Sequence, residues 1–247
     1  MLARTGRATP VGNPCDIRSL GPNARLYRGR MPPTQLTPTA RTTVRRLPAR
    51  GSYDRDQLNA IVDEALHCHV GFAVDGRPWV IPTIHARLGD DLYVHGALAN
   101  HMLGRLADGV EACVTITLVD GLVLARSQFH HSMNYRSVVI FGCAMPVTDR
   151  DEKIAALRAL VEHVVPGRAA EARPPTDPEL RKTLVLRLPI VEASVKLRTG
   201  GPIDDEEDLT MPIWAGVLPS AVTFGDPIAD DGVTAAPPGY VTGYARA

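Results

Sequence analysis

This chain of 247 residues is poor in aromatic side chains, which make up 5% of it, and in cysteine, of which it has four. The cysteines (Cys15, Cys68, Cys113 and Cys143) show no Cys-x-x-Cys spacing, so they do not indicate a structural zinc site. Three of them lie in apolar runs, and we expect small buried side chains in a reducing cytoplasm rather than disulfides. No apolar run approaches the roughly 20 residues that span a bilayer, and no signal peptide is recognisable. These absences predict a cytoplasmic protein with no membrane partner.

The common nucleotide-binding and nucleophile motifs are missing as well. The sequence contains no Walker loop, no G-x-G-x-x-G fingerprint and no G-x-S-x-G elbow, which argues against P-loop, Rossmann and hydrolase chemistry. His67-Cys68-His69 and His130-His131 invite a metal interpretation. No carboxylate or thiolate stands at a ligand spacing from them, so we predict no metal site.

The formal net charge of zero, from 27 basic and 27 acidic residues, hides an uneven distribution. Residues 1–50 hold ten arginines and one acid, Asp16, which leaves 17 basic and 26 acidic residues in 51–247. A body with nine net negative charges is a poor match for a phosphate backbone, so we do not expect nucleic-acid binding. Residues 1–50 are also rich in Pro, Gly and Thr, and we interpret them as a flexible arm.

Hydrophobic periodicity predicts one mainly β domain over residues 51–225, followed by a Pro/Gly-rich tail over 226–247. Expected strands fall near 69–74, 79–85, 92–95, 111–118, 122–127, 135–147, 184–198 and 211–224, with a hairpin turn at Asp75-Gly76. Expected helices begin after Asp54, Asn100, Asp149 and Thr176. The pattern favours a closed antiparallel barrel of six or seven strands with helices at its ends.

The segment DLYVHGALANHMLGRLAD, residues 91–108, carries the strongest local signal. It is typical of a strand that turns into a helix, and such a turn offers free backbone N–H groups to a phosphate. His95, Asn100 and His101 could add side-chain donors. In the preceding strand we expect Thr83 and His85 to share one face, suited to a ligand wall or to solvent, while Ile84 points into the core.

Two further features could contact a ligand. A polar stretch lies between apolar strands and contains Arg126, Ser127, Tyr135, Arg136 and Ser137. Because strand ends seldom bury so many polar groups without partners, we expect ligand or dimer contacts there. Trp214, among small residues late in the chain, is either a core residue or a cofactor stack.

The order of four motifs resembles the pyridoxamine 5′-phosphate oxidase-related family of FMN-binding split barrels. The motifs are VIPTIHAR, LYVHGALANHML, HSMNYRSVVIFG and WAGVLP, and the resemblance extends from about Tyr53 to Phe224. It is closest to the branch of flavin-nucleotide-binding proteins akin to nitroimidazole-resistance reductases. The family implies a split antiparallel β-barrel with peripheral helices and a homodimer that holds FMN between its subunits.

The resemblance also implies roles for individual residues. Thr83 and His85 match the strand that meets the flavin, and His95 and Gly96 match the strand end beneath the phosphate. Asn100, His101 and Met102 stand where better-known oxidases carry a Ser-Arg-Lys phosphate clamp, so Arg126 is a candidate for the missing charge. Arg136 and Ser137 match flavin-contacting positions that act across the dimer, and Trp214 resembles a late Trp beside the isoalloxazine.

The resemblance leaves vitamin B6 oxidase activity unsupported, because the tail has only Arg246 where those enzymes have an Arg-rich substrate motif. It predicts an FMN-dependent oxidoreductase that reduces a small planar substrate, with the flavin supplying the redox chemistry. The alternative is a non-catalytic flavin- or haem-binding protein, with His85, His95 or His131 as an axial ligand. A deazaflavin is a third cofactor that the resemblance leaves open.

Overall fold

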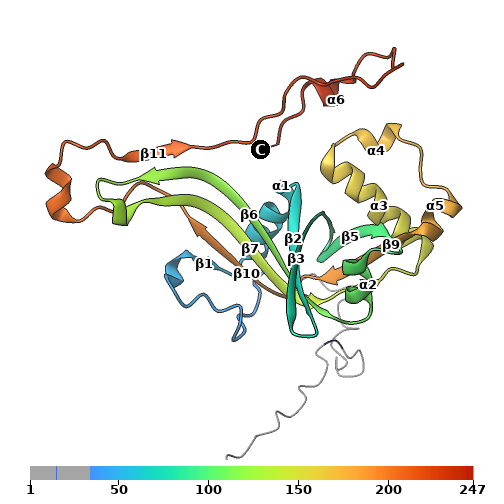
Figure 1. Cartoon of the computed structure of the whole chain (residues 1–247), viewed down its shortest axis with the longest axis horizontal. Coiled ribbons are helices and arrows are strands. Elements are labelled where there is room, and N and C mark those ends of the chain that lie inside the picture. The colour runs from blue at the N-terminus through green and yellow to red at the C-terminus, as the bar shows by residue number, and fades with distance from the viewer. Residues whose placement is uncertain (1–14, 16–33, 247) are drawn as a thin grey trace, which may run out of the picture.

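Two antiparallel sheets form the framework of the chain, which a computed structural model describes for Cys15 and residues 34–246 (Figure 1). The larger sheet has seven strands, and β11 pairs with β6 beside the main order. In spatial order the strands are β1 (Gly51–Ser52), β10 (Glu192–Arg198), β7 (Ser132–Cys143), β6 (Glu111–Leu124), β2 (His67–Val74) and β3 (Arg77–Ile84), with β11 (Gly216–Pro219) on β6. The smaller sheet runs β4 (Ala86–Leu88), β5 (Asp91–Ala97), β9 (Thr183–Pro189) and β8 (Met145–Pro146).

The prediction of a mainly antiparallel β domain with added helices is confirmed, but the expected closed barrel is wrong. In the described part of the chain, β3 pairs only with β2, and the last residues of β5 pair only with β9. β3 and β5 contact each other without sharing a hydrogen-bonded ladder. The sheets therefore meet at an open split, which leaves two strand edges without backbone partners.

Side-chain caps start the main helices where the sequence predicts them. Asp54 accepts a hydrogen bond from the Gln57 amide at the start of α1 (Arg55–Glu64), and Asp149 does the same for Glu152 at α3 (Arg150–Val164). The other helices are α2 (His101–Ala107), α4 (Arg168–Glu171), α5 (Asp177–Lys182) and α6 (Gly239–Thr242), with 3₁₀ turns at Pro48–Arg50, Gln128–His130 and Glu206–Thr210. None of the described helices is long and apolar enough to cross a membrane.

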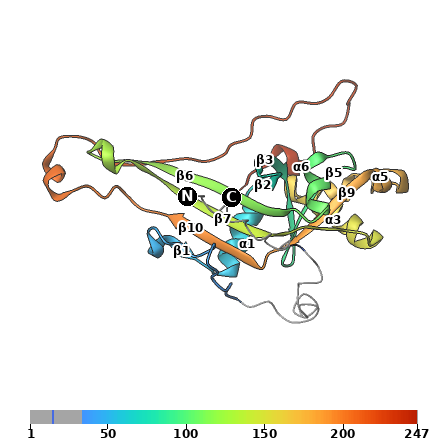
Figure 2. The ribbon, with the colours of Figure 1, turned by 60° about the horizontal axis from the view of Figure 1, so that its bottom comes forward.

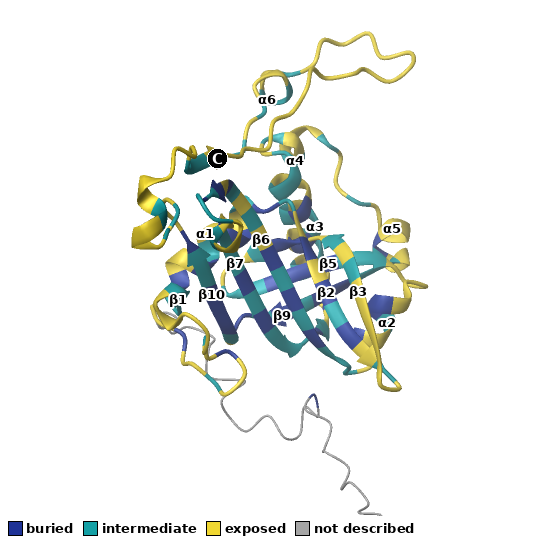
Figure 3. Ribbon diagram, turned by 60° about the vertical axis from the view of Figure 1, so that its left-hand side comes forward, coloured by how far each residue is buried: buried dark blue, intermediate teal, exposed yellow. Residues whose placement is uncertain are grey.

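One apolar core fills the space between the two sheets. The inner face of β2, β6 and β7 contributes alternate residues, seen as dark bands in Figure 3, and packs against β5, β9 and the helices α1 and α2. A smaller cluster around Tyr93, Val185 and Ala156 attaches α3 to the other face of the four-stranded sheet. β5 and β9 are therefore covered on both faces, which explains their continuous apolar runs.

The predicted strand over 184–198 is two strands in different sheets. β9 ends at Pro189, which cannot donate a ladder hydrogen bond, and the chain then crosses to β10. The crossing is fixed by Ile190, whose amide donates to the Asp90 carbonyl and whose side chain is buried. The predicted strand over 211–224 is similarly reduced to β11, because only residues 216–219 pair with β6.

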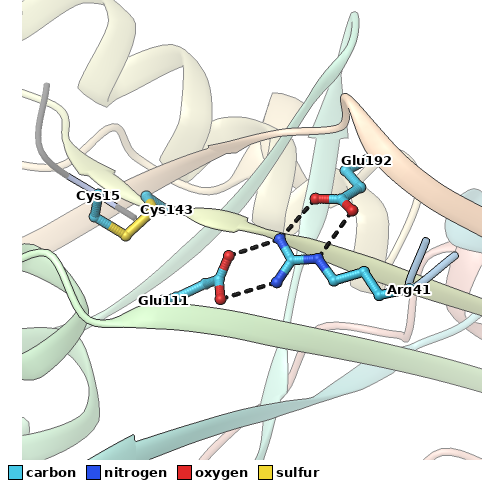
Figure 4. Close-up of a disulfide and its surroundings, with 5 residues drawn as sticks. All are labelled: Cys15, Arg41, Glu111, Cys143 and Glu192. Atoms are coloured by element: carbon cyan, nitrogen blue, oxygen red, sulfur yellow. Dashed lines mark hydrogen bonds and ion pairs between the residues drawn. A yellow bond between two sulfur atoms is a disulfide. The ribbon is translucent and has the colours of Figure 1, made fainter. Parts of the chain in front are cut away.

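The expectation that the cysteines stay reduced is wrong for two of them. Cys15 and Cys143 form a disulfide that joins the predicted arm to the end of β7 (Figure 4). Beside it, the Arg41 guanidinium donates to both Glu111 and Glu192, on β6 and β10. The described part of the arm, Cys15 and residues 34–50, thus contacts the seven-stranded sheet, while residues 1–14 and 16–33 lie outside the described residues.

The C-terminal segment joins two helix ends through one side chain. The guanidinium of Arg246 donates to the carbonyls of Asp63 (2.8 Å) and Glu64 (2.9 Å) at the end of α1, and to that of His163 in the last turn of α3. Terminal helix carbonyls lack intrahelical partners and carry partial negative charge, so a cation stabilises them. Tyr244 adds a hydrogen bond to the Val164 carbonyl at 2.6 Å.

Replacing Arg246 by Ala is expected to lower the free energy of unfolding by about 1–3 kcal/mol, because it removes charge-assisted hydrogen bonds to three carbonyls. Urea unfolding followed by circular dichroism measures the change. Arg158→Ala, an exposed position on α3, serves as the control and should stay within about 0.5 kcal/mol of the parent. Equal stability of the Arg246→Ala variant and the parent would contradict this role of the tail.

Candidate functional site

The split between β3 and β5 brings together most of the residues that the strand-turn-helix motif predicts. Thr83 lies in β3, paired with buried Cys68, and is half-buried. Ile84 is paired with exposed His67 and is itself exposed, so its predicted position in the core is wrong. His95 and Gly96 lie near the end of β5, where only β9 is paired, and Asn100 caps α2 directly afterwards.

The turn after β5 offers uncharged hydrogen-bonding groups. The Nδ1 atom of His95 is buried without a hydrogen-bond partner, and burial lowers the pKa of this histidine. Asn100 accepts from the Leu103 amide with Oδ1 at 3.0 Å, which leaves its Nδ2 group for another acceptor. His101 is exposed. The site can therefore bind a polar or anionic group through neutral donors.

Two neighbouring residues support this turn from within the protein. Met102 belongs to the main core, so its thioether packs against apolar residues. A Cβ at Gly96 would lie 2.9 Å from Leu103 Cδ1, so glycine lets α2 approach β5 closely. Of the predicted contacts, these two have a packing explanation that requires no ligand.

The predicted arginines are engaged in ion pairs. Arg126 Nη1 lies 2.7 Å from Asp204 Oδ2, and the Asp204 side chain is buried. Arg136 donates to Glu64 at the end of α1 and to Asp120 on β6, and these bonds raise the pKa of Arg136. Both cations are thus neutralised within the chain, which the sequence pattern did not indicate.

The remaining predicted residues lie along the hairpin of β6 and β7 or just before β11. This hairpin extends from the core (Figures 1 and 2). Ser127 lies near its end, Ser137 Oγ donates to the Lys196 carbonyl at 3.0 Å, and Tyr135 is paired with Val119 and Arg198. Trp214 precedes β11 and is largely exposed, with its ring over Gly216. It is therefore not a core residue of the monomer.

His131 has the geometry of an available ligand. Its Nδ1 atom donates to the Ser127 carbonyl at 2.9 Å, since a carbonyl can only accept. The neutral ring then has an unprotonated Nε2 on an exposed residue. Near His131 in the sequence, Phe129 and Met133 expose apolar side chains.

A buried histidine pair lies behind the split, and sequence reasoning missed one of its members. His85 is fully buried, its Nε2 donates to the Val62 carbonyl at 2.9 Å, and its Nδ1 has no hydrogen-bond partner. The His163 ring lies 4.8 Å from it between centroids, and Arg246 covers the same region. Burial, with repulsion from His163 and Arg246, lowers the pKa of His85 to about 4. No local motif links residues 85, 163 and 246, so only the fold reveals the group.

Comparison with known proteins identifies the family. The family model for pyridoxamine 5′-phosphate oxidase matches residues 54–197, more than half of the chain, so the chain belongs to this family. No curated protein matches it. The predicted family resemblance is confirmed.

Two solved structures are similar over more than three quarters of the chain. The flavocytochrome Anf3 from Azotobacter vinelandii is 36% identical, with a TM-score of 0.79 over 86% of this chain and 100% of that one. An FAD and heme binding protein from Mycobacterium smegmatis is 38% identical, with a TM-score of 0.75 over 78% of this chain and 96% of that one.

The buried histidines predict a pH dependence of stability. Because the pKa of His85 is lowered from 6.5 to about 4 in the folded state, the unfolded chain binds a proton more readily between these values. The free energy of unfolding should therefore be highest above pH 6.5 and fall by about 3 kcal/mol as the pH approaches 4. His163 adds to this fall because its pKa is also lowered.

Urea unfolding at a series of pH values measures this slope. His85→Gln removes the titrating ring and should flatten the slope, whereas His69→Gln, on the exposed side of β2, should leave it unchanged. A slope that is the same in the His85→Gln variant and the parent would contradict the assignment.

Proposed function

We propose that this protein binds a flavin nucleotide and a haem and acts as a redox protein. The observation that carries the proposal is its similarity, over more than three quarters of its length, to a flavocytochrome and to an FAD and heme binding protein. When bound, these groups supply electron transfer, and the chain's residues bind them, orient them and exclude solvent.

The split between β3 and β5 is the proposed flavin site. His95 Nδ1 and Asn100 Nδ2, with exposed His101 beside them, fit an anionic phosphate as hydrogen-bond donors. Since the predicted arginines Arg126 and Arg136 are already paired within the chain, neither one supplies the charge of a Ser-Arg-Lys clamp. We therefore expect phosphate binding to depend more on geometry than on charge. The family resemblance suggests FMN, and a deazaflavin would use the same donors.

His131 is the proposed axial ligand of the haem. A histidine that ligates a metal usually donates its other ring N–H to a carbonyl or carboxylate, and His131 already does so through Ser127. The exposed apolar side chains of Leu122, Phe129 and Met133 on the same hairpin fit a porphyrin face. His85 is less suitable, because its surroundings leave no exposed surface for a porphyrin.

The acceptor of the electrons is proposed to be a small planar molecule. The split lies at a free strand edge, where Thr83 and Ile81 are half-buried and could form one wall. No covalent nucleophile motif suggests another reaction, so the proposed chemistry is flavin-dependent reduction.

The proposed assembly is a homodimer. The hairpin and the segment beside it expose an unusual number of large apolar side chains for a monomer: Val119, Leu122, Phe129, Met133, Met211, Ile213, Trp214 and Leu218. Within one chain the end of the hairpin lies away from α2 (Figure 1). If Arg126 and Trp214 serve the same cofactor as His101, they must come from a second copy, as the family resemblance implies.

The cofactor proposal is tested by the absorbance spectrum of the purified protein and by mass spectrometry of the compounds released on denaturation. We expect flavin bands together with a haem Soret band. His131→Ala should abolish or shift the Soret band and leave the flavin bands unchanged. The matched control is His130→Ala, whose Nε2 is bonded to Asp205 and which should keep both spectra. A parent protein that stays colourless after incubation with FMN, FAD and haemin would refute the proposal.

The assembly is tested by light scattering of the intact chain. We expect a mass of twice the 26.6 kDa of one chain. Leu122→Asp introduces a charge on the hairpin and should favour the monomer, because burying an unpaired charge is costly. Ile228→Asp, at an exposed apolar position in the tail, is the control and should leave the mass unchanged. A monomeric parent would contradict the assembly.

A further inference from the structure

Three aromatic rings form a cluster at the end of the split nearest α2. Trp79 on β3 is paired with Phe72 on β2, and the two rings are stacked, with centroids 6.4 Å apart and planes at 13°. His101 leans against the indole, with centroids 5.3 Å apart and planes at 48°. Phe72 is buried, whereas Trp79 is 44% exposed and His101 is exposed. The indole of Trp79 thus packs against Phe72 and His101 and keeps a large accessible surface.

Two arginines lie on the elements that carry this cluster. Arg77 lies two residues before Trp79 in β3, so both side chains leave the strand on the same face. Arg105 lies one helical turn after His101 in α2 and therefore on the same side of the helix. Arg105 Nη1 lies 3.8 Å from Asp108 Oδ2, and both side chains are largely exposed. The guanidinium of Arg105 therefore remains accessible. A packed aromatic surface with an accessible cation on the same face of its strand and another on the same side of its helix is suited to a nucleotide base attached to phosphates.

We infer that Trp79, with His101 beside it, forms a stacking platform for the adenine ring of a flavin dinucleotide, with Arg77 and Arg105 near its diphosphate. This inference rests on the proposed flavin site at the split. His101 belongs both to the proposed phosphate turn and to the aromatic cluster, so the platform lies next to the end of the flavin mononucleotide. FMN ends at that phosphate, whereas FAD continues with a second phosphate and adenosine. The chain therefore binds FAD more tightly than FMN.

Direct binding measurements with flavin-free full-length protein test the inference. The chain has only two tryptophans, so Trp214→Phe leaves Trp79 as the sole indole reporter. In that variant we expect FAD and ADP to quench the fluorescence of Trp79, since ADP carries adenine and two phosphates but no flavin. If ADP does not quench the fluorescence of Trp79 even at concentrations at which FAD binding is saturated, the inference is overturned.

Trp79→Ala supplies the second measurement. Loss of base stacking should weaken FAD binding by about 5- to 150-fold, the equivalent of about 1–3 kcal/mol, and change FMN binding less than about twofold. Trp79→Phe should restore most of the FAD affinity because it keeps a ring at this position. Val80→Ala, at an exposed position on the opposite face of β3, is the matched control and should not change the ratio of FAD to FMN affinity.

The outcomes separate this inference from the proposed function. Equal affinity of the parent for FAD and FMN, or equal weakening of both by Trp79→Ala while the far-UV spectrum is unchanged, would overturn the adenine platform and leave the flavin site standing. If the parent binds neither flavin, the proposed function fails and the platform fails with it.

Discussion

Burial of alternate side chains from β2, β6 and β7 against β5, β9, α1 and α2 builds a single core that belongs to both sheets. A sheet can bury its apolar face only against another layer, so the two sheets depend on each other. The chain must cross between them, and it does so at buried His85 and Ile190. At one side of this core β3 and β5 contact each other without a hydrogen-bonded ladder, and the candidate site lies at this split.

The same packing determines the electrostatics of the site. Arginines that a linear sequence offers as phosphate ligands are used to hold the structure: Arg126 binds Asp204, Arg136 binds Glu64 and Asp120, and Arg246 binds the ends of α1 and α3. Separating a paired charge from its partner in such a contact costs free energy, because it leaves a charge without compensation. The split is therefore left with neutral histidine and amide donors, and charge is accessible only at its rim, near Trp79.

The extended hairpin of β6 and β7 is the part of the fold on which the proposed assembly depends. Its apolar side chains have no covering element in the described part of the chain, and it also carries His131, oriented by the Ser127 carbonyl. A surface of this kind gains free energy when a second copy or a flat apolar group removes it from water. The proposed haem and the proposed second subunit are thus both consistent with one physical feature, an apolar arm that the monomer leaves exposed.

Local chemistry in the sequence determined several elements of the protein. Asp54, Asn100 and Asp149 start helices because their side chains cap the adjacent amides, and Asp75-Gly76 turns a hairpin because both residues adopt positive φ. The order of the family motifs likewise lies in the sequence. Only the tertiary structure decided that residues 184–198 divide between two sheets, that Cys15 reaches Cys143, that Ile84 is exposed and that His163 lies beside His85. These outcomes depend on contacts between residues far apart in the chain, and hydrophobic periodicity carries no information about which distant partner a residue meets.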